Sequence, residues 1–432
     1  MRLRGITTLL CVFACGPRVP ADDGSAGDGS SEDTGALDTS TSMAPTGPDG
    51  SGSGDVGEEE DVGDDKIDFP PDDDPIADRL DVLVVVDNSA HTADLQIAMG
   101  EAMGAFVERL SENARDVQVM FTTTDMGNPN CTPFQQPDYE PALGAPTTTG
   151  CNARIGHFTG LGSNPDVRAD ACTSLCPVDI APSDPFVAFD TMTGETNVGP
   201  FDAVDDALAC LLPQGISGCG YESPLEAMLQ ALNPNAEWNG GARPFLREGA
   251  DLAIVIVTDE SDCSVEDYSV MEDEAYQEVN PDNGNRQASS ALCWNAGVQC
   301  TGPDADGVYT GCMSIADGPL RPVSRYADAL VGLSASGKRV SMLAVVGVPG
   351  VVRDFQDSDV FPSEIPDGVD AADLQFDFGI GPTCVRADEL EIRAIPNPRV
   401  LEVCAAVDGC CTASACDEHD AGLGCLVEIT SQ

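Results

Sequence analysis

Two unbroken apolar runs constrain the fold of this chain more than any other feature. Val82 to Val86 reads Val-Leu-Val-Val-Val, and Leu252 to Val257 reads Leu-Ala-Ile-Val-Ile-Val. Neither run alternates with polar residues, which is typical of strands buried on both faces of a parallel sheet under helices. Each run ends in acid, at Asp87 and at Asp259. Because ligands of open α/β sheets bind outside the carboxyl ends of the strands, these two ends predict one shared crevice.

The segments around the two runs alternate between helical and strand patterns. Apolar residues from Leu95 to Leu110 recur every three or four positions and predict an amphipathic helix, in which the methionines fill the core. Further strands are expected at 117–123 and 341–348, and further helices near 203–212, 224–232, 323–333 and 399–407. This order predicts an α/β fold with a doubly wound, mostly parallel sheet.

Cysteine-rich segments interrupt this alternation. We place insertions at about 125–200, 263–318 and 350–395 of a domain spanning 79–432, followed by a Cys-rich C-terminal tail. Of 18 cysteines, Cys11 and Cys15 lie in the N-terminal segment, which leaves an even number for disulfides in an oxidising compartment. The adjacent Cys410 and Cys411 should bond to different partners. Metal binding by Cys172 and Cys176 is the competing interpretation, but no second cysteine pair accompanies them.

The N-terminus has the layout of an export signal. A short basic stretch precedes the apolar residues 6–14, which are too few to span a membrane. The small residue Ala14 before Cys15 resembles the lipobox of bacterial lipoproteins. That resemblance implies a signal at 1–15, a lipid on Cys15, and a place in the bacterial cell envelope, on the outer membrane or cell surface. Ordinary secretion is the alternative.

Residues 16–78 are rich in Gly, Ser and Asp and contain almost no large apolar side chain. Such a segment cannot form a core, so we expect an acidic, disordered linker. Calcium binding by its acidic runs is the alternative, although a disordered run offers no fixed cage of ligands. The net charge of −54, with only 20 Lys and Arg, argues against nucleic acid as a partner and against attraction to anionic lipid.

The residues after the first apolar run resemble a known family. Asp87, Ser89 and His91 are spaced like the Asp-x-Ser-x-Ser motif of von Willebrand factor A-type (vWA) domains, which opens a metal-ion-dependent adhesion site. The resemblance extends over about 80–124, 203–262 and 321–348. It implies that Asp87, Ser89, Ser223 and Asp259 ligate Mg²⁺ or Mn²⁺. It also implies that the ion binds the carboxylate of a partner, a protein or another carboxylate-bearing ligand.

His91 departs from that motif, because an imidazole stands where the family has a serine hydroxyl. Magnesium takes nitrogen poorly, so the site could bind metal weakly, select a more nitrogen-tolerant ion with His91 as a ligand, or have lost metal. The other candidate ligands also have structural interpretations. Ser223 begins a Ser-Pro-Leu-Glu capping box, Asp87 could cap the following helix, and the acids from Asp259 to Asp262 could form a solvated loop.

The sequence therefore favours a binding or adhesion module rather than an enzyme. It contains three histidines and none of the nucleophile-elbow, His-Glu-x-x-His or phosphate-loop motifs of common enzymes. Two alternatives remain open. One is a structural envelope protein that has lost its metal site, and the other is a metal-assisted hydrolase using Asp87, Asp259 and His91.

Overall fold

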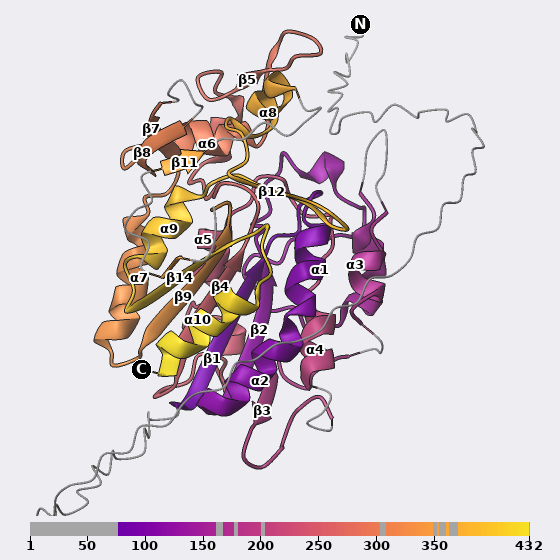
Figure 1. Cartoon of the computed structure of the whole chain (residues 1–432), viewed down its shortest axis with the longest axis vertical. Helices are drawn as coiled ribbons and strands as arrows, with labels where there is room; N and C mark the ends of the chain where they lie inside the picture. The colour runs from indigo at the N-terminus through magenta and orange to yellow at the C-terminus, as the bar shows by residue number, and fades with distance from the viewer. Residues whose placement is uncertain are drawn as a thin grey trace, which may run out of the picture. The chain divides into compact units, whose positions relative to one another are not determined.

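The two apolar runs form adjacent strands in the middle of a seven-stranded sheet. The computed structural model describes residues 77–160, 167–176, 180–199, 204–302, 308–348, 352–353, 360–362 and 370–431. The strands of the sheet lie in the order β10-β14-β9-β4-β1-β2-β3 (Figure 1). Their bounds are β1 Ala77–Val86, β2 Ala114–Thr123, β3 Val187–Asp190, β4 Asp251–Val257, β9 Val340–Val346, β10 Val352–Arg353 and β14 Gly409–Ser414.

The sheet is mostly parallel, as the sequence predicted. The five strands from β14 to β2 run in one direction, and only the edge strands β3 and β10 are antiparallel to their neighbours. Val86 at the end of β1 pairs with Val257 at the end of β4. The chain proceeds outward from β1 through β2 to β3, and in the opposite direction from β4 through β9 to β14. The strand order therefore reverses between β1 and β4.

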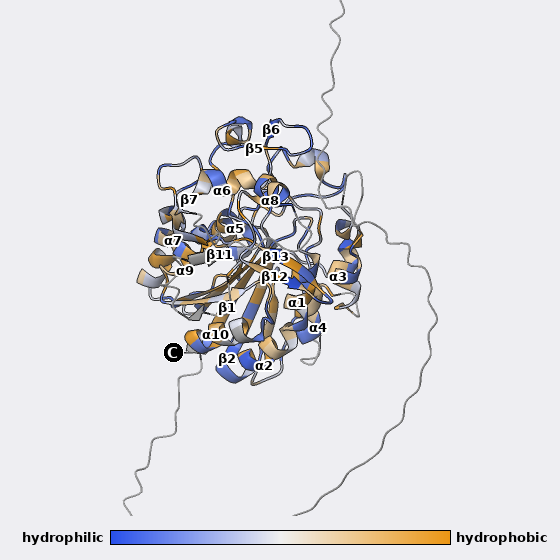
Figure 2. Ribbon diagram, turned by 45° about the horizontal axis from the view of Figure 1, so that its top comes forward, coloured by the Kyte–Doolittle hydropathy of each residue, from blue (hydrophilic) through white to orange (hydrophobic). Residues whose placement is uncertain are grey.

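Helices cover both faces of the sheet. Val82 and Val84 of β1 pack with α1, α2, α4 and α10, whereas Leu83 and Val85 pack with α5, α7 and α9 on the opposite face. This alternation explains why β1 has no polar position along its core-forming length. Figure 2 shows the central strands mostly in the hydrophobic colour, with hydrophobic stretches on the helices as well. The helices are α1 Ala93–Glu101, α2 Met103–Asn113, α4 Val204–Leu211, α5 Pro224–Ala231, α7 Ser324–Ala335, α9 Pro398–Cys404 and α10 Asp420–Ser431.

One expectation about these elements was wrong. The apolar spacing from Leu95 to Leu110 does not form one helix, because the chain divides it into α1 and α2 at Ala102. The Cys-rich tail supplies β14 and α10, and Leu423, Leu426 and Val427 of α10 are buried in the core. Cys411 and Cys425 belong to the same core and pack as small apolar side chains.

The insertions carry short elements of their own. Those of the second insertion gather at one end of the sheet, together with α8 and β11 (Figure 1). The third insertion contains α8 and a two-stranded hairpin formed by β12 and β13. The bounds are α3 Asp170–Thr173, β5 Glu278–Val279, β6 Arg286–Gln287, α6 Ala291–Gly297, β7 Val298–Thr301, β8 Val308–Ser314, β11 Val360–Pro362, α8 Ala371–Phe378, β12 Cys384–Ala387 and β13 Glu391–Ala394.

All sixteen described cysteines form disulfides, which confirms the expectation that cysteines staple the insertions. Cys172 and Cys176 bond to separate partners, so the sulfur-metal interpretation of that pair is wrong. Cys410 and Cys411 also have different partners, as predicted. The pairs are Cys131–Cys219, Cys151–Cys172, Cys176–Cys210, Cys263–Cys293, Cys300–Cys312, Cys384–Cys416, Cys404–Cys410 and Cys411–Cys425.

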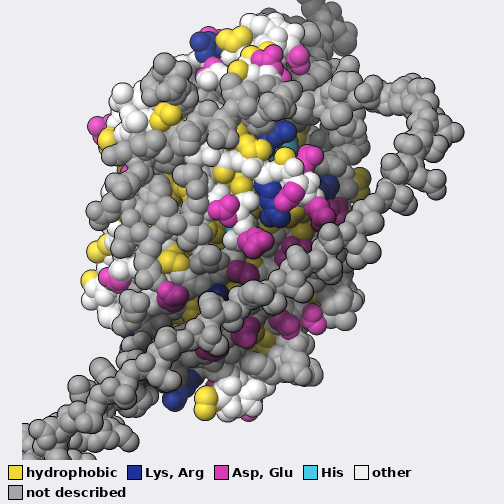
Figure 3. Space-filling view, viewed as in Figure 1, with side chains coloured by type: hydrophobic (Ala, Val, Ile, Leu, Met, Phe, Trp, Pro, Cys, Tyr) yellow, Lys and Arg dark blue, Asp and Glu magenta, His cyan; other side chains and the backbone are white. Residues whose placement is uncertain are grey.

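The predicted signal, the lipid-bearing Cys15 and almost all of the predicted linker lie outside the described residues. Strand β1 begins at Ala77, two residues before the predicted start of the domain at 79. In the described part of the chain, no helix is both long enough and apolar enough to span a membrane. Acidic side chains are spread widely over the face seen in Figure 3.

Candidate functional site

The candidate site lies at the carboxyl ends of β1 and β4, where the strand order reverses. Asp87 follows β1 and Asp259 follows β4 after one intervening residue, Thr258. The Thr258 hydroxyl donates to Asp87 Oδ2 at 2.6 Å, and the Asp87 amide donates to the Val257 carbonyl at 2.9 Å. Asp87 and Asp259 therefore share one edge of the sheet, at the position where doubly wound sheets bind their ligands.

The loop after β1 is held by its own side chains. The Ser89 amide donates to Asp87 Oδ1 at 2.9 Å, and the Gln96 side chain donates to the Asp87 carbonyl at 2.9 Å. Thr92, not Asp87, occupies the N-cap position of α1, so the interpretation of Asp87 as a helix cap was wrong. The Ser89 hydroxyl is buried and interacts with the Asp87 carboxylate, which opposes the rise that burial causes in the pKa of that carboxyl. A hydroxyl that donates to a carboxylate keeps its oxygen lone pairs available to a ligand.

A residue of the first insertion contacts this loop. The Asn88 side-chain amide donates to the Tyr139 hydroxyl at 2.8 Å, and that hydroxyl donates to Asp125 Oδ2 at 2.9 Å. The amide of Cys219, which is bonded to Cys131, also donates to Asp125 Oδ2, at 3.0 Å. The hydrogen bonds that Asp125 accepts therefore hold the insertion against the site. Burial raises its pKa, while the hydrogen bonds it accepts oppose that rise.

Ser223 reaches the same edge through backbone contacts. Its amide donates to the Thr124 carbonyl at 3.0 Å, and the Thr124 amide donates to the Val86 carbonyl at 3.2 Å. The predicted capping box does not form. The Ser223 hydroxyl donates to the Cys263 carbonyl at 3.1 Å, and the Glu226 carboxylate accepts from Arg325 instead.

Two neighbours of Ser223 matter more than the sequence indicated. Glu222 is completely buried, and its carboxyl group is hydrogen-bonded to the carboxyl group of Glu260. The Thr124 hydroxyl, just beyond β2, is also buried and has no hydrogen-bond partner. We did not predict either residue. Their only signal was position: Glu222 lies two residues before a helix that starts with proline, and Thr124 is the first residue after a strand.

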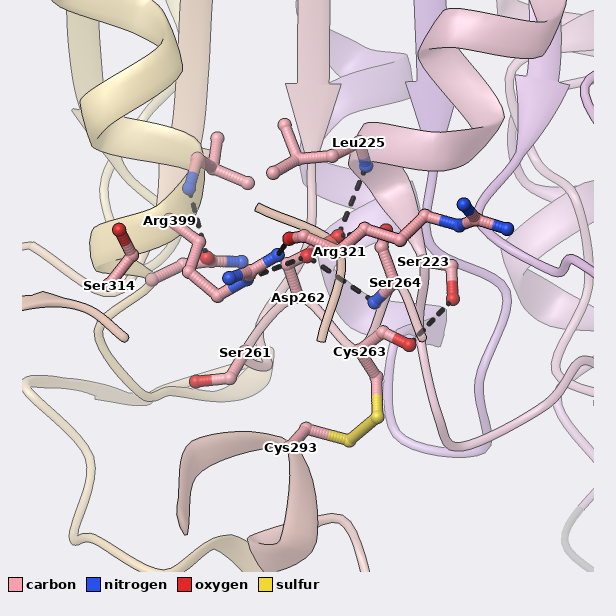
Figure 4. Close-up of polar contacts among 12 residues, drawn as sticks. Ser223, Leu225, Ser261, Asp262, Cys263, Ser264, Cys293, Ser314, Arg321 and Arg399 are labelled. Atoms are coloured by element: carbon pink, nitrogen blue, oxygen red, sulfur yellow. Dashed lines mark hydrogen bonds and ion pairs between the residues drawn. A yellow bond between two sulfur atoms is a disulfide. The ribbon is translucent and has the colours of Figure 1, made fainter. Parts of the chain in front are cut away.

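The acidic stretch after β4 is buried, so the expectation of a solvated loop was wrong. Asp259 is 5% exposed, Glu260 4% and Asp262 0%. These three acids differ in their partners. Asp262 accepts from Leu225 N, Ser264 and Arg399, with the Arg399 Nε atom 2.9 Å from Asp262 Oδ2 (Figure 4). In contrast, Asp259 Oδ1 has no partner, and the Glu260 carboxyl group interacts with the side chains of Ser290 and Glu222. Asp262 is therefore structural, whereas Asp259 retains a free ligand atom.

The four buried acids Asp87, Glu222, Asp259 and Glu260 lie close together without a counter-charge. None of them forms an ion pair within the described residues. Burial, and then the negative charges of their neighbours, raises the pKa of Glu222 and of Asp259 well above the usual range. The pKa of Glu260 rises to about 8 for the same reasons, first burial and then the charge of Asp87. A bound cation would remove this repulsion.

The donor atoms at this edge suit a hard divalent cation. The buried oxygens gathered here belong to Asn88, Ser89, Thr124, Glu222, Asp259 and Glu260, and they are amide, hydroxyl and carboxylate oxygens. Mg²⁺ and Ca²⁺ prefer such ligands, and Mg²⁺ usually retains several waters. Among the described residues, no group of three or more Asp, Glu, His or Cys side chains is arranged so that it could hold a metal ion by itself. Serine and threonine hydroxyls and waters would have to complete the coordination.

The structure thus brings together Asp87, Ser89, Ser223 and Asp259 at one edge. His91 behaves differently, because its side chain is exposed while Asp87, Asn88 and Ser89 beside it are buried. Its role as a ligand stays a prediction.

A scan against protein-family models found no match, and a search of curated proteins found no significantly similar sequence.

Proposed function

We propose that this protein is an exported, lipid-anchored binding module of the vWA type, which uses a divalent cation at the β1 and β4 edge to engage a carboxylate-bearing partner. One observation carries the proposal. Buried carboxylates without counter-charges meet buried hydroxyls at the point where the strand order reverses. Buried polar groups are normally paired, so such a cluster requires an explanation, and a bound ion supplies one.

The ligands of the cation would be Asp87, Ser89 and Asp259. A further hydroxyl would come from Ser223, just before α5, or from Thr124, just after β2. Ser223 uses its hydrogen to bond the Cys263 carbonyl, so its oxygen lone pairs stay available to an ion. The bound ion would supply an open coordination position for a partner's carboxylate oxygen. The residues of this chain would fix that position, because the strand ends and the Asn88–Tyr139–Asp125 contacts hold the surrounding loops.

The anchor and the export belong to the same proposal. The eight disulfides of the domain are typical of a protein that folds in an oxidising compartment. The lipid on Cys15 would hold the domain at the bacterial envelope through the acidic segment 16–78.

The first experiment measures cation binding. The metal-free full chain is titrated with MgCl₂ and MnCl₂ by calorimetry, beside Asp87→Asn, His91→Ala and the control Glu266→Gln, whose parent side chain is exposed. We expect binding that Asp87→Asn abolishes and Glu266→Gln leaves unchanged. His91→Ala reports whether the exposed ring contributes to affinity. No heat from the wild-type chain, or an Asp87→Asn variant that binds like it, would exclude the proposed site.

The second experiment tests the partner chemistry. The chain is applied to immobilised peptides, each carrying Asp or Glu, and to counterparts carrying Asn or Gln. Binding to the acidic peptides should require Mg²⁺ or Mn²⁺ and disappear in chelator. Equal binding to both sets, or binding that survives chelation, contradicts a cation-bridged contact.

A further inference from the structure

A half-exposed leucine beside the candidate site has a backbone conformation that leucine rarely adopts. Leu143 has a φ of 55° and is the only non-glycine residue with positive φ in the described part of the chain. Gly144 follows with a φ of 82°, and the Ala145 amide donates to the Ala142 carbonyl at 2.8 Å. Two central residues of positive φ are typical of type I′ turns, in which Gly, Asn and Asp predominate. Leucine is strained there, because its Cβ atom approaches the following carbonyl oxygen.

The turn is fixed against the end of β2 and against α5. The Leu143 amide donates to the Asp125 carbonyl at 3.1 Å, and Asp125 directly follows the candidate ligand Thr124. A Cβ atom at Gly144 would lie 2.9 Å from the Ala227 carbonyl oxygen, so only glycine lets the turn lie this close to α5. The surrounding structure therefore imposes the conformation of Leu143 beside the candidate cation site.

The Leu143 side chain does not compensate for this strain by entering the core. It lies over the loop after β2, since a Cβ atom at Gly127 would be 3.1 Å from Leu143 Cδ2, yet it remains 49% exposed. An exposed leucine is ordinary on a protein surface, but one in a strained conformation is not. Because backbone strain is concentrated at functional sites, a role for the exposed side chain explains why a leucine occupies this position.

The charges around the turn restrict what a partner can place there. Asp138 and Glu140 precede the turn in the same insertion, and both are exposed. They would repel a second acidic group of the partner, whereas an apolar group can pack against Leu143. The chemistry that fits is therefore one carboxylate with an apolar side chain next to it.

We propose that Leu143 is a specificity-determining contact of the cation site, and that it selects a protein partner in which an apolar side chain adjoins the cation-bound carboxylate. This role depends on the proposed function, because the cation would hold the carboxylate while Leu143 covers the neighbouring side chain. Burial of that apolar contact should change the affinity about tenfold.

The test compares peptides that differ only beside the acid. Immobilised peptides carry Asp next to Leu or Asp next to Ser, and the full chain is applied in MgCl₂ or MnCl₂ and in chelator. The wild-type chain should bind the Leu peptide about tenfold more tightly than the Ser peptide. Leu143→Asn should lose this preference but keep the wild-type cation affinity in calorimetry.

A stability measurement separates recognition from packing. Asparagine adopts positive φ more readily than leucine, so Leu143→Asn should unfold at the same urea concentration as wild type or at a higher one. A lower midpoint would assign Leu143 to the packing of the turn and overturn the proposal. The control is Met192→Asn, because Met192 is 73% exposed and follows β3 at the opposite edge of the sheet. This variant should change neither peptide binding nor stability.

Two further results distinguish a failure of Leu143 from a failure of the site. Cation-dependent binding of both peptides with equal affinity, or a preference that Leu143→Asn retains, leaves the cation site and removes the role of Leu143. No cation-dependent binding of either peptide by the wild-type chain removes both.

Discussion

Replacing Arg399 with leucine should destabilise the protein by about 3–5 kcal/mol. Arg399 and Asp262 are both 0% exposed, and their ion pair joins α9 to the loop after β4 (Figure 4). Removing one partner of a buried pair leaves the other charge uncompensated, and such losses typically cost about 3–5 kcal/mol. Arg399 also donates to the Arg321 carbonyl at 2.6 Å, and that contact is lost as well. Most single domains are stable by only about 5–15 kcal/mol, so the effect is large.

Urea unfolding with intact disulfides measures this change, through the shift in midpoint at constant slope. The matched control is Arg386→Leu, because Arg386 forms a more exposed pair with Asp388, at 24% and 57% side-chain exposure. Exposed pairs contribute about 0–1 kcal/mol, so this variant should be close to wild type.

A double variant isolates the charge. Asp262→Asn keeps a side-chain oxygen that can accept from the Leu225 amide but removes the buried negative charge. Adding Asp262→Asn to Arg399→Leu should therefore recover part of the lost stability. If Arg399→Leu costs no more than Arg386→Leu, or if the double variant is less stable than Arg399→Leu alone, the ion pair does not hold the loop as argued.

Two further predictions concern the pKa of Glu260 and the anchor. In chelator, the free energy of unfolding should fall as pH rises from about 4.5 to about 8, because Glu260 keeps its proton up to about pH 8 only in the folded chain. The full pKa shift corresponds to about 5 kcal/mol of unfolding free energy. Glu260→Gln should flatten the plot of unfolding free energy against pH over this range. A wild-type stability that rises over this range, or equal slopes in both chains, would contradict the prediction. Cys15→Ser should move the chain from the membrane fraction to the soluble fraction of a bacterial host, and continued sedimentation with membranes would argue against the lipid anchor.

Much of the sheet could be predicted because its strands are buried on both faces. Residues 82–86 and 252–257 carry that signal without polar interruptions, and the helices between them have clear apolar spacing. β14 was missed because Gly409 to Ser414 is made of small and sulfur-containing residues, whose burial depends on disulfides that the sequence cannot pair. The break at Ala102 was missed because α1 and α2 continue the same apolar spacing.

The candidate site was predictable only at its strand ends. Asp87 and Asp259 follow buried strands, and parallel strands deliver their ends to one edge, so their proximity followed from the topology. Glu222 lies on a loop between helices, and no local pattern distinguishes it from an exposed acid. The capping box at Ser223 failed for a tertiary reason. The loop after β4 offered the Cys263 carbonyl to its hydroxyl, and Arg325 and Tyr326 took the Glu226 carboxylate.

The adjacent cysteines of β14 have a consequence for how the end of the chain can move. Neighbouring strand residues point to opposite faces, and here Cys410 bonds to Cys404 of α9 while Cys411 bonds to Cys425 of α10. The strand is thus joined covalently to both helical layers. A slip by one residue would exchange the two faces, which these bonds forbid, so the register of β14 against β9 is locked. Proteolytic cleavage between β14 and α10 would likewise leave the C-terminal helix attached while the disulfides remain oxidised.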